Sequence, residues 1–163
     1  MITPCEAQVF TWAFLFSLSF EELLRVMSEN FRYVHGLGHV GSYQTSARPF
    51  LSSSLTVPDE ASEPLEIAFD SVSRFIIVTN TMSPSEPSRP LRFGFSANGV
   101  KGVADNNYVV LDNAETFEAE FKVSKVFLLS DSIQESSGSV VAGLTGISSS
   151  HLRNNWSGSA GVG

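Results

Sequence analysis

The sequence predicts an all-β fold, a sandwich of short strands in one domain, and three observations support this prediction. From Gly36 onward, apolar and polar residues alternate with a period of two, the pattern of half-buried strands. Turn-forming residues interrupt this pattern roughly every ten positions, as they do in sandwiches and barrels. The 163 residues include 13 phenylalanines but are only 17% charged, whereas soluble proteins average about 25%.

We expect residues 1–30 to form an apolar and helical extension that differs from the rest of the chain. Residues 9–20 are almost wholly apolar and strongly aromatic, and no basic residue precedes them. A secretory signal is therefore not predicted, since such signals begin with positive charge. Ser19 and Glu22 match a capping box, which predicts a short helix over residues 20–29.

Three interpretations of residues 9–20 stay open at this stage. The segment is an anchor on a membrane or a partner subunit, a piece packed on its own domain, or an upstream extension that precedes a natural start at Met27. As an anchor it offers four large aromatic side chains, those of Phe10, Trp12, Phe14 and Phe16.

Eight segments alternate in polarity or carry β-branched runs, and we predict that each is a strand. They are residues 39–50, 65–69, 74–80, 91–95, 108–111, 117–123, 125–130 and 139–147. Pro49, near the end of the first segment, is typical of an edge strand, whereas the apolar run at 74–80 is typical of a central one. With no helical pattern between them, eight strands fit a single jelly-roll β-sandwich made of two Greek keys.

The alternation also assigns the faces of these strands. The residues predicted to face the core include Leu65, Ile67, Phe69, Phe117, Ala119, Phe121 and Val123. Glu118 and Glu120 alternate with the last four and are predicted to face solvent. The many phenylalanines suit a two-sheet core about 10 Å thick, in which rings from opposite sheets interdigitate.

Turn-forming residues mark the connections between strands. Residues 52–64, rich in Ser, Pro and acidic residues, are predicted to be a loop. Residues 81–90 contain three prolines and are predicted to be an exposed loop. Asn98 and Gly99 predict a tight turn.

The sandwich is predicted to span residues 31–147, and a Gly- and Ser-rich tail follows at residues 148–163. The tail carries Trp156, and a bare flexible end seldom carries a tryptophan without use. We therefore expect the tail to be either a lid over the sandwich edge or an arm that docks on a neighbouring subunit.

No pattern in the sequence is typical of an active site or a metal centre, so we predict a non-enzymatic protein without cofactors. Two glycines separate His35 from His39, and no third metal ligand lies nearby. The spacing of Glu118 and Glu120 predicts a solvated strand face rather than a catalytic carboxylate pair. Cys5 has no basic neighbour that would activate its thiol.

Two classes of nucleotide or nucleic-acid partner are also disfavoured. The glycines at 36, 38 and 41 have the spacing of the dinucleotide-binding fingerprint. That fingerprint requires a helix after the glycines, whereas a strand is predicted here. The formal net charge of −7 argues against a basic face for phosphates, and we expect no direct contact with nucleic acid.

Residues 36–50, GLGHVGSYQTSARPF, resemble the opening of small single jelly-roll capsid proteins encoded by large DNA viruses of algae and their environmental relatives. Softer similarities follow over residues 75–80, 91–95, 107–112 and 117–128, and again at residues 144–147. The similarity covers residues 36–163, and only its first block is specific. The apolar extension departs from the family pattern.

The resemblance implies a structural protein of an icosahedral shell, located in the virion as the pentameric vertex (penton) subunit or a minor capsid component. Its partners would be further copies of itself in a ring, the neighbouring major and minor capsid proteins and, through residues 9–20, the internal viral membrane. The residues we expect at the interface between subunits are His39, Tyr43, Arg48, Phe50 and Trp156.

A second function shares the fold, namely a carbohydrate- or receptor-binding module of a viral spike or tail. The proline-rich loop at residues 81–90 suits display to a receptor, but it contains no aromatic residue that would stack on a sugar. An enzyme is the third interpretation, and it would require a polar pocket.

Overall fold

The structure is a computed structural model, and it describes residues 36, 38–41, 48–103 and 106–152. These residues all belong to the second of the two units into which the chain divides, residues 35–163. The predicted helix at 20–29, the apolar run at 9–20 and most of the predicted tail lie outside the described residues.

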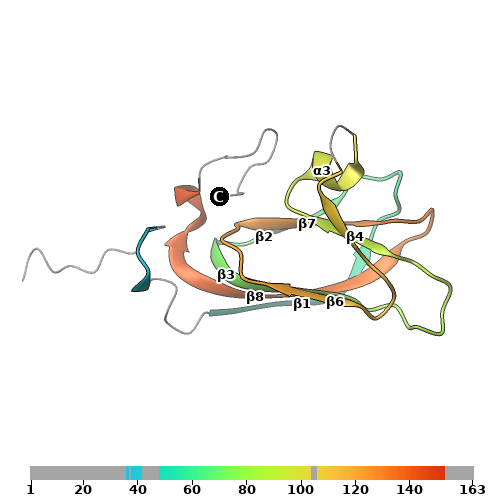
Figure 1. Ribbon diagram of the computed structural model, residues 1–163, viewed down its shortest axis with the longest axis horizontal. Helices are drawn as coiled ribbons and strands as arrows, with labels where there is room; N and C mark the ends of the chain where they lie inside the picture. Colours follow the sequence, from blue (N-terminus) through green and yellow to red (C-terminus); the bar gives the residue numbers. More distant parts are fainter. Residues whose placement is uncertain (1–35, 37, 42–47, 104–105, 153–163) are drawn as a thin grey trace, which may run out of the picture. The chain divides into compact units, whose positions relative to one another are not determined.

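The described chain is mostly β, with eight strands in two antiparallel four-stranded sheets that face each other (Figure 1). The strands are β1 (Arg48–Val57), β2 (Leu65–Ala68), β3 (Ser71–Asn80), β4 (Leu91–Gly94), β5 (Tyr108–Leu111), β6 (Thr116–Ala119), β7 (Lys125–Ser130) and β8 (Ser136–Ser148). One sheet has the order β1-β8-β3-β6, and the other has the order β2-β7-β4-β5. The prediction of an all-β fold is thus confirmed, and so is the central place of β3 between β8 and β6.

The first strand begins and ends later than predicted. Residues 38–41 are not in a strand, whereas residues 52–57, predicted to be a loop, are part of β1. Hydroxyl residues made this stretch look like a loop, but Leu55 and Val57 turn toward the core and the strand pairs with β8 as far as Ser136. A bulge between Ser52 and Leu55, with Ser54 at a φ of 55°, absorbs the break in alternation. β1 does lie at a sheet edge, as Pro49 indicated.

The core lies between the two sheets and contains most of the residues that alternation predicted. Ile67 and Phe69 are buried, and Leu65 packs against them half-buried. The buried side chains of this cluster are Val57, Ile67, Phe69, Ile76, Val78, Leu91, Phe93, Leu111, Val123, Val126, Leu128, Val140, Ala142 and Leu144. Phe93 of one sheet meets Phe117 of the other with ring centroids 5.3 Å apart, so aromatic rings do interdigitate across the core.

The sixth strand is shorter than predicted. β6 ends at Ala119, and Phe121 is 39% exposed rather than facing the core. The cause lies on β3, where the Ser73 hydroxyl donates to the Phe121 carbonyl at 2.6 Å and accepts from the Val123 amide at 3.1 Å. These bonds hold the chain as it leaves one sheet and crosses to β7 in the other. Of the four residues predicted to face the core from this segment, Val123 is the one that is buried.

The predicted turn at Asn98 and Gly99 is instead a short helix, α3 (Ala97–Lys101). The Ser96 hydroxyl caps it by accepting from the Gly99 amide at 3.0 Å, and Gly102 ends it in the left-handed conformation with a φ of 68°. α3 covers part of the outer face of the β2-β7-β4-β5 sheet, where a second cluster contains Val100, Phe127 and Leu129. The capping signal at Ser96 therefore outweighed the Asn-Gly turn signal.

This description predicts a large difference between two chemically identical substitutions. Ile76→Ala removes a fully buried side chain from β3 and should lower the free energy of unfolding by about 2–5 kcal/mol. Ile133→Ala changes a side chain that is 80% exposed and should alter it by less than about 0.5 kcal/mol. Urea unfolding followed by fluorescence measures both. Similar losses for the two variants would contradict the placement of β3 in the core.

Candidate functional site

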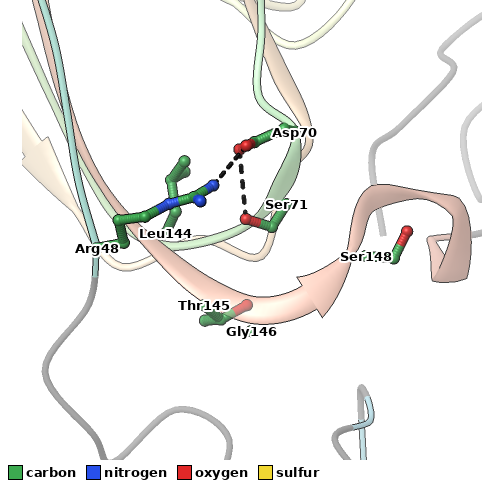
Figure 2. A pocket seen from close by; sticks show the side chains of 7 residues that line it. All are labelled: Arg48, Asp70, Ser71, Leu144, Thr145, Gly146 and Ser148. Atoms are coloured by element: carbon green, nitrogen blue, oxygen red, sulfur yellow. Dashed lines mark hydrogen bonds and ion pairs between the residues drawn. The ribbon is translucent and has the colours of Figure 1, made fainter.

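A pocket of about 460 Å³ lies at the end of the sandwich where β1 begins, β2 passes into β3 and β8 ends (Figure 2). Its lining residues are Arg48, Asp70, Ser71, Leu144, Thr145, Gly146 and Ser148. We take it as the candidate functional site because it is concave and combines an ion pair with several hydroxyl groups.

The pocket exists because β8 and β3 lose their regular pairing here. β8 advances four residues from Leu144 to Ser148 while β3 moves only two, from Ser73 to Ser71. The two extra residues bend β8 away from β3, as a bulge does. The Thr145 hydroxyl donates to the Val72 carbonyl at 2.8 Å and so fixes the bend.

The side chains of Arg48 and Asp70 form an ion pair across the pocket (Figure 2). Arg48 starts the edge strand β1, and Asp70 occupies the turn between β2 and β3. The pair therefore links the start of β1 to the turn between β2 and β3. Both side chains are largely exposed to solvent, and exposed pairs of this kind add little to stability. The pair therefore shapes the pocket more than it holds the fold.

The hydrogen bond from Arg48 holds the pKa of the Asp70 carboxyl below its ordinary value. Because the pKa is lower in the folded state, the stabilisation by this pair is fully present above the pKa of the unfolded chain. It is lost as the pH falls through the folded-state pKa. At neutral pH the described lining of the pocket thus presents one positive and one negative group.

The described lining residues offer a guanidinium, a carboxylate and hydroxyl groups for binding a polar surface. Ser71 and Ser148 carry hydroxyls, and the lining residues that the structure describes include no histidine, cysteine or lysine that would activate them. Within the part of the chain that the structure describes, no three His, Cys, Asp or Glu residues gather as metal ligands would. Guanidinium, carboxylate and hydroxyl groups together can satisfy the main-chain and side-chain polar groups of another protein.

The opposite end of the sandwich carries the proline-rich loop, which is irregular and exposed at residues 83–88 as predicted. Two asparagines hold it. Asn80 is fully buried, and its amide group donates to the carbonyls of Arg89 and Leu111 at 3.0 and 3.1 Å. Its carbonyl oxygen accepts from the Met82 amide at 3.1 Å.

Asn113 fastens the same loop from the turn between β5 and β6. Its amide nitrogen lies 3.0 Å from the Ser83 carbonyl and 3.2 Å from the Pro87 carbonyl. Its carbonyl oxygen accepts from the Arg89 amide at 3.0 Å. The loop is therefore a preorganised surface feature, whose main-chain groups are bound to side chains of two other segments.

Three of the predicted interface residues can be placed. Arg48 lines the pocket, whereas Phe50 is half-buried and packs edge-to-face on Phe69 with centroids 5.0 Å apart. His39 is exposed, and its main-chain amide donates to the Gly36 carbonyl at 3.1 Å. Of these three, the structure brings only Arg48 into the candidate site.

The other predicted site residues lie outside the described residues. They are Tyr43 and Trp156 of the expected interface, and Phe10, Trp12, Phe14 and Phe16 of the expected anchor. Among the residues that the structure does describe, no helix has the length and apolar character that crossing a membrane requires.

Sequence reasoning missed the residues that complete the pocket. Asp70 is 22 positions from Arg48, and nothing in the local pattern joins them. Thr145 and Ser148 belong to a stretch that reads as a regular strand end. A weak signal was present, since the run from Gly143 to Gly146 interrupts an otherwise β-branched strand.

Comparison with protein-family models, with curated proteins and with solved structures finds no match to this chain.

The ion pair in the pocket makes a prediction about pH. In Arg48→Gln the carboxyl of Asp70 should lose its charged partner, and its pKa should rise toward the ordinary aspartate value. NMR titration of the side-chain carboxyl carbon in both proteins measures the change. Arg74→Gln is the control, since Arg74 pairs with Glu120 instead. An unchanged Asp70 pKa in Arg48→Gln would contradict the pairing.

A second prediction concerns the proline-rich loop. Asn113→Ala removes several hydrogen bonds to the loop, each worth about 1 kcal/mol, so amide exchange in residues 83–88 should speed up by roughly tenfold or more. Asn98→Ala, at an exposed position of α3, is the matched control and should leave this exchange unchanged. Equal exchange in Asn113→Ala and the unmutated chain would show that Asn113 does not hold the loop.

Proposed function

We propose that this chain is a structural subunit of an icosahedral virus shell, specifically its pentameric vertex subunit. We also propose that its sandwich is a single jelly roll. The observation that carries the proposal is the pairing of the strands. β1 pairs with β8, β2 with β7, β3 with β6 and β4 with β5, each pair antiparallel.

This nested pairing supports the jelly roll because it describes one long antiparallel ribbon folded over on itself. The first half of the chain, β1 to β4, pairs in reverse order with the second half, β5 to β8. Wrapping such a ribbon places alternate pairs in opposite sheets, and further pairings of β8 with β3 and of β7 with β4 join them. Eight strands arranged as two Greek keys are the definition of a jelly roll, a common fold of viral capsid domains.

A fold alone does not assign a function, so the proposal also draws on the sequence and the site. The block at residues 36–50 resembles the opening of small capsid proteins of large DNA viruses. The described lining of the pocket around Arg48 has the polar groups of a contact surface. A building block of a shell requires stable surfaces for neighbouring proteins and no reaction chemistry.

The proposal names the partners and the location. The subunit binds further copies of itself in a ring, and it contacts the adjacent major and minor capsid proteins of the virion. Residues 9–20 reach the internal viral membrane. The acidic net charge of −7 favours contacts with proteins over direct contact with the genome.

One observation favours a second function, a carbohydrate- or receptor-binding module of a spike or tail. The proline-rich loop is held rigid by Asn80 and Asn113 and is exposed at its tip. A preorganised loop lowers the entropic cost of binding a receptor. Its tip carries serines, prolines and Glu86 but no aromatic platform for a sugar.

The shell function predicts that the purified full chain forms closed pentameric rings. Native mass spectrometry and electron microscopy of the same sample measure the copy number and the closure. A chain that stays monomeric up to about 0.1 mM, a concentration at which contacts far weaker than the micromolar range would already be populated, would contradict the proposal. A monomer that also binds on a glycan array would favour the receptor-binding module instead.

A further inference from the structure

The ion pair in the pocket leaves hydrogen-bonding groups unused. Arg48 donates to Asp70 through one nitrogen, Nη2, so only part of its guanidinium, which has five N–H donors, is engaged. The second carboxylate oxygen of Asp70, Oδ1, lies 3.5 Å from the Ser71 hydroxyl, a long contact that leaves this oxygen able to accept another hydrogen bond (Figure 2). The side chains of Arg48 and Asp70 are 63% and 69% exposed. The pair therefore presents a donor and an acceptor side by side to a ligand.

Two of the hydroxyl groups in the lining are already engaged within the bend of β8. The Thr145 hydroxyl donates to the Val72 carbonyl at 2.8 Å and accepts from the Ile147 amide at 3.2 Å. The Ser148 hydroxyl lies 2.9 Å from that of Ser150 and accepts from the Ser150 amide at 3.4 Å. These hydroxyls hold the bend, so the ion pair supplies the main polar contacts for a ligand.

Gly146 leaves the main chain of the pocket lining accessible. It is exposed, whereas its neighbours Thr145 and Ile147 are buried. Of the glycines that the structure describes, Gly102 is the one with a positive φ, so the backbone conformation does not require a glycine at position 146. A glycine in a strand often lies where another backbone approaches closely. The missing side chain therefore makes room for the main chain of a ligand.

The charges of the pair favour a neutral ligand. Because Arg48 and Asp70 are in contact, an anion that Arg48 attracts is repelled by Asp70, and the reverse holds for a cation. A zwitterion could meet both groups only by separating them, and its own charges would lose part of their hydration. A neutral group with one acceptor and one donor can bind both side chains and leave the pair intact.

Two neutral groups have this chemistry, the amide and the neighbouring hydroxyls of a sugar. A sugar ring also presents an apolar face for an aromatic side chain to cover, and the lining residues that the structure describes include no aromatic residue. A protein main chain needs only one acceptor and one donor, which each residue other than proline supplies. The pocket therefore suits main-chain amides better than a sugar.

We propose that this pocket binds an extended, uncharged main-chain segment of another shell protein. A carbonyl of the segment accepts a hydrogen bond from Arg48, an N–H of the segment donates to Asp70, and its backbone passes over Gly146. The inference rests on the proposed function, and it specifies the chemistry that an adjacent capsid protein presents at this pocket.

The test titrates the full-length chain with small probes and follows their binding by saturation-transfer NMR, which detects weak ligands on a monomer or on an assembly. The neutral amide probe is dialanine with an acetylated N-terminus and an amidated C-terminus. Acetate is the anionic probe, glycine the zwitterionic probe and methyl glucoside the sugar probe.

Three variants alter the pocket, and a fourth is the control. Arg48→Gln removes the guanidinium, Asp70→Asn removes the carboxylate, and Gly146→Val fills the space over the main chain. Arg74→Gln is the charge-matched control, since Arg74 pairs with Glu120 and does not line the pocket. Circular dichroism and urea unfolding confirm that each variant folds, and Gly146→Ala replaces Gly146→Val where that one does not.

The unmutated chain should bind the capped dialanine in the millimolar range, because both groups of the pair are exposed, and more tightly than the other three probes. Arg48→Gln and the Gly146 variant should each weaken this binding by at least about tenfold, the first through a lost hydrogen bond to a charged group and the second through lost space. Asp70→Asn should reverse the preference, because Arg48 without its partner binds acetate more tightly than the amide. Arg74→Gln should bind every probe as the unmutated chain does.

Each other outcome overturns a stated part. Tighter binding of glycine or methyl glucoside than of the capped dialanine overturns the amide ligand in favour of a free amino acid or a sugar. Dialanine binding that is absent, or equal in all variants, overturns the pocket as the binding site, and pentameric rings in the same sample leave the shell function standing. Dialanine binding by a chain that forms no ring overturns the shell function and leaves the chemistry of the pocket standing.

Discussion

The pairing of β8 with both β1 and β3 is the interaction on which the remaining structure depends. β8 is 13 residues long and joins the first strand of the fold to the third, so it closes contacts between residues that are far apart in the chain. The inward residues Val140, Ala142 and Leu144 supply the share of the core that comes from β8. Their outward neighbours make the exposed face, and the bend after Leu144 opens the pocket. One strand therefore positions the core, the face and the pocket.

The outer faces of the two sheets carry different kinds of residues. One sheet carries a single capped turn of helix and several ion pairs on its outer surface. On the outer face of the other sheet, Leu51 is 73% exposed, and its neighbours Val141 and Ile77 are half-buried. The edge strand β1 of this sheet carries Pro49 and a bulge between Ser52 and Leu55, two features that discourage edge-to-edge pairing.

Most of the fold could be predicted from the sequence, because alternation records burial directly. Leu65, Ile67 and Phe69 were placed correctly, and so were the limits of β5 and β7. Errors arose where the local sequence pattern and long-range strand pairing favour different structures. In β1, the run of hydroxyl residues is typical of a loop, but pairing with β8 makes it a strand. The pocket was not predictable, since it depends on two extra residues in β8 relative to β3 and on an ion pair between Arg48 and Asp70. Neither leaves a periodic trace in the sequence.

The most direct measurement of the central claim is a cryo-electron microscopy reconstruction of the assembly formed by the full chain. The account predicts a closed pentameric ring of jelly rolls. A chain that stays monomeric, or an assembly that does not close with fivefold symmetry, would contradict it.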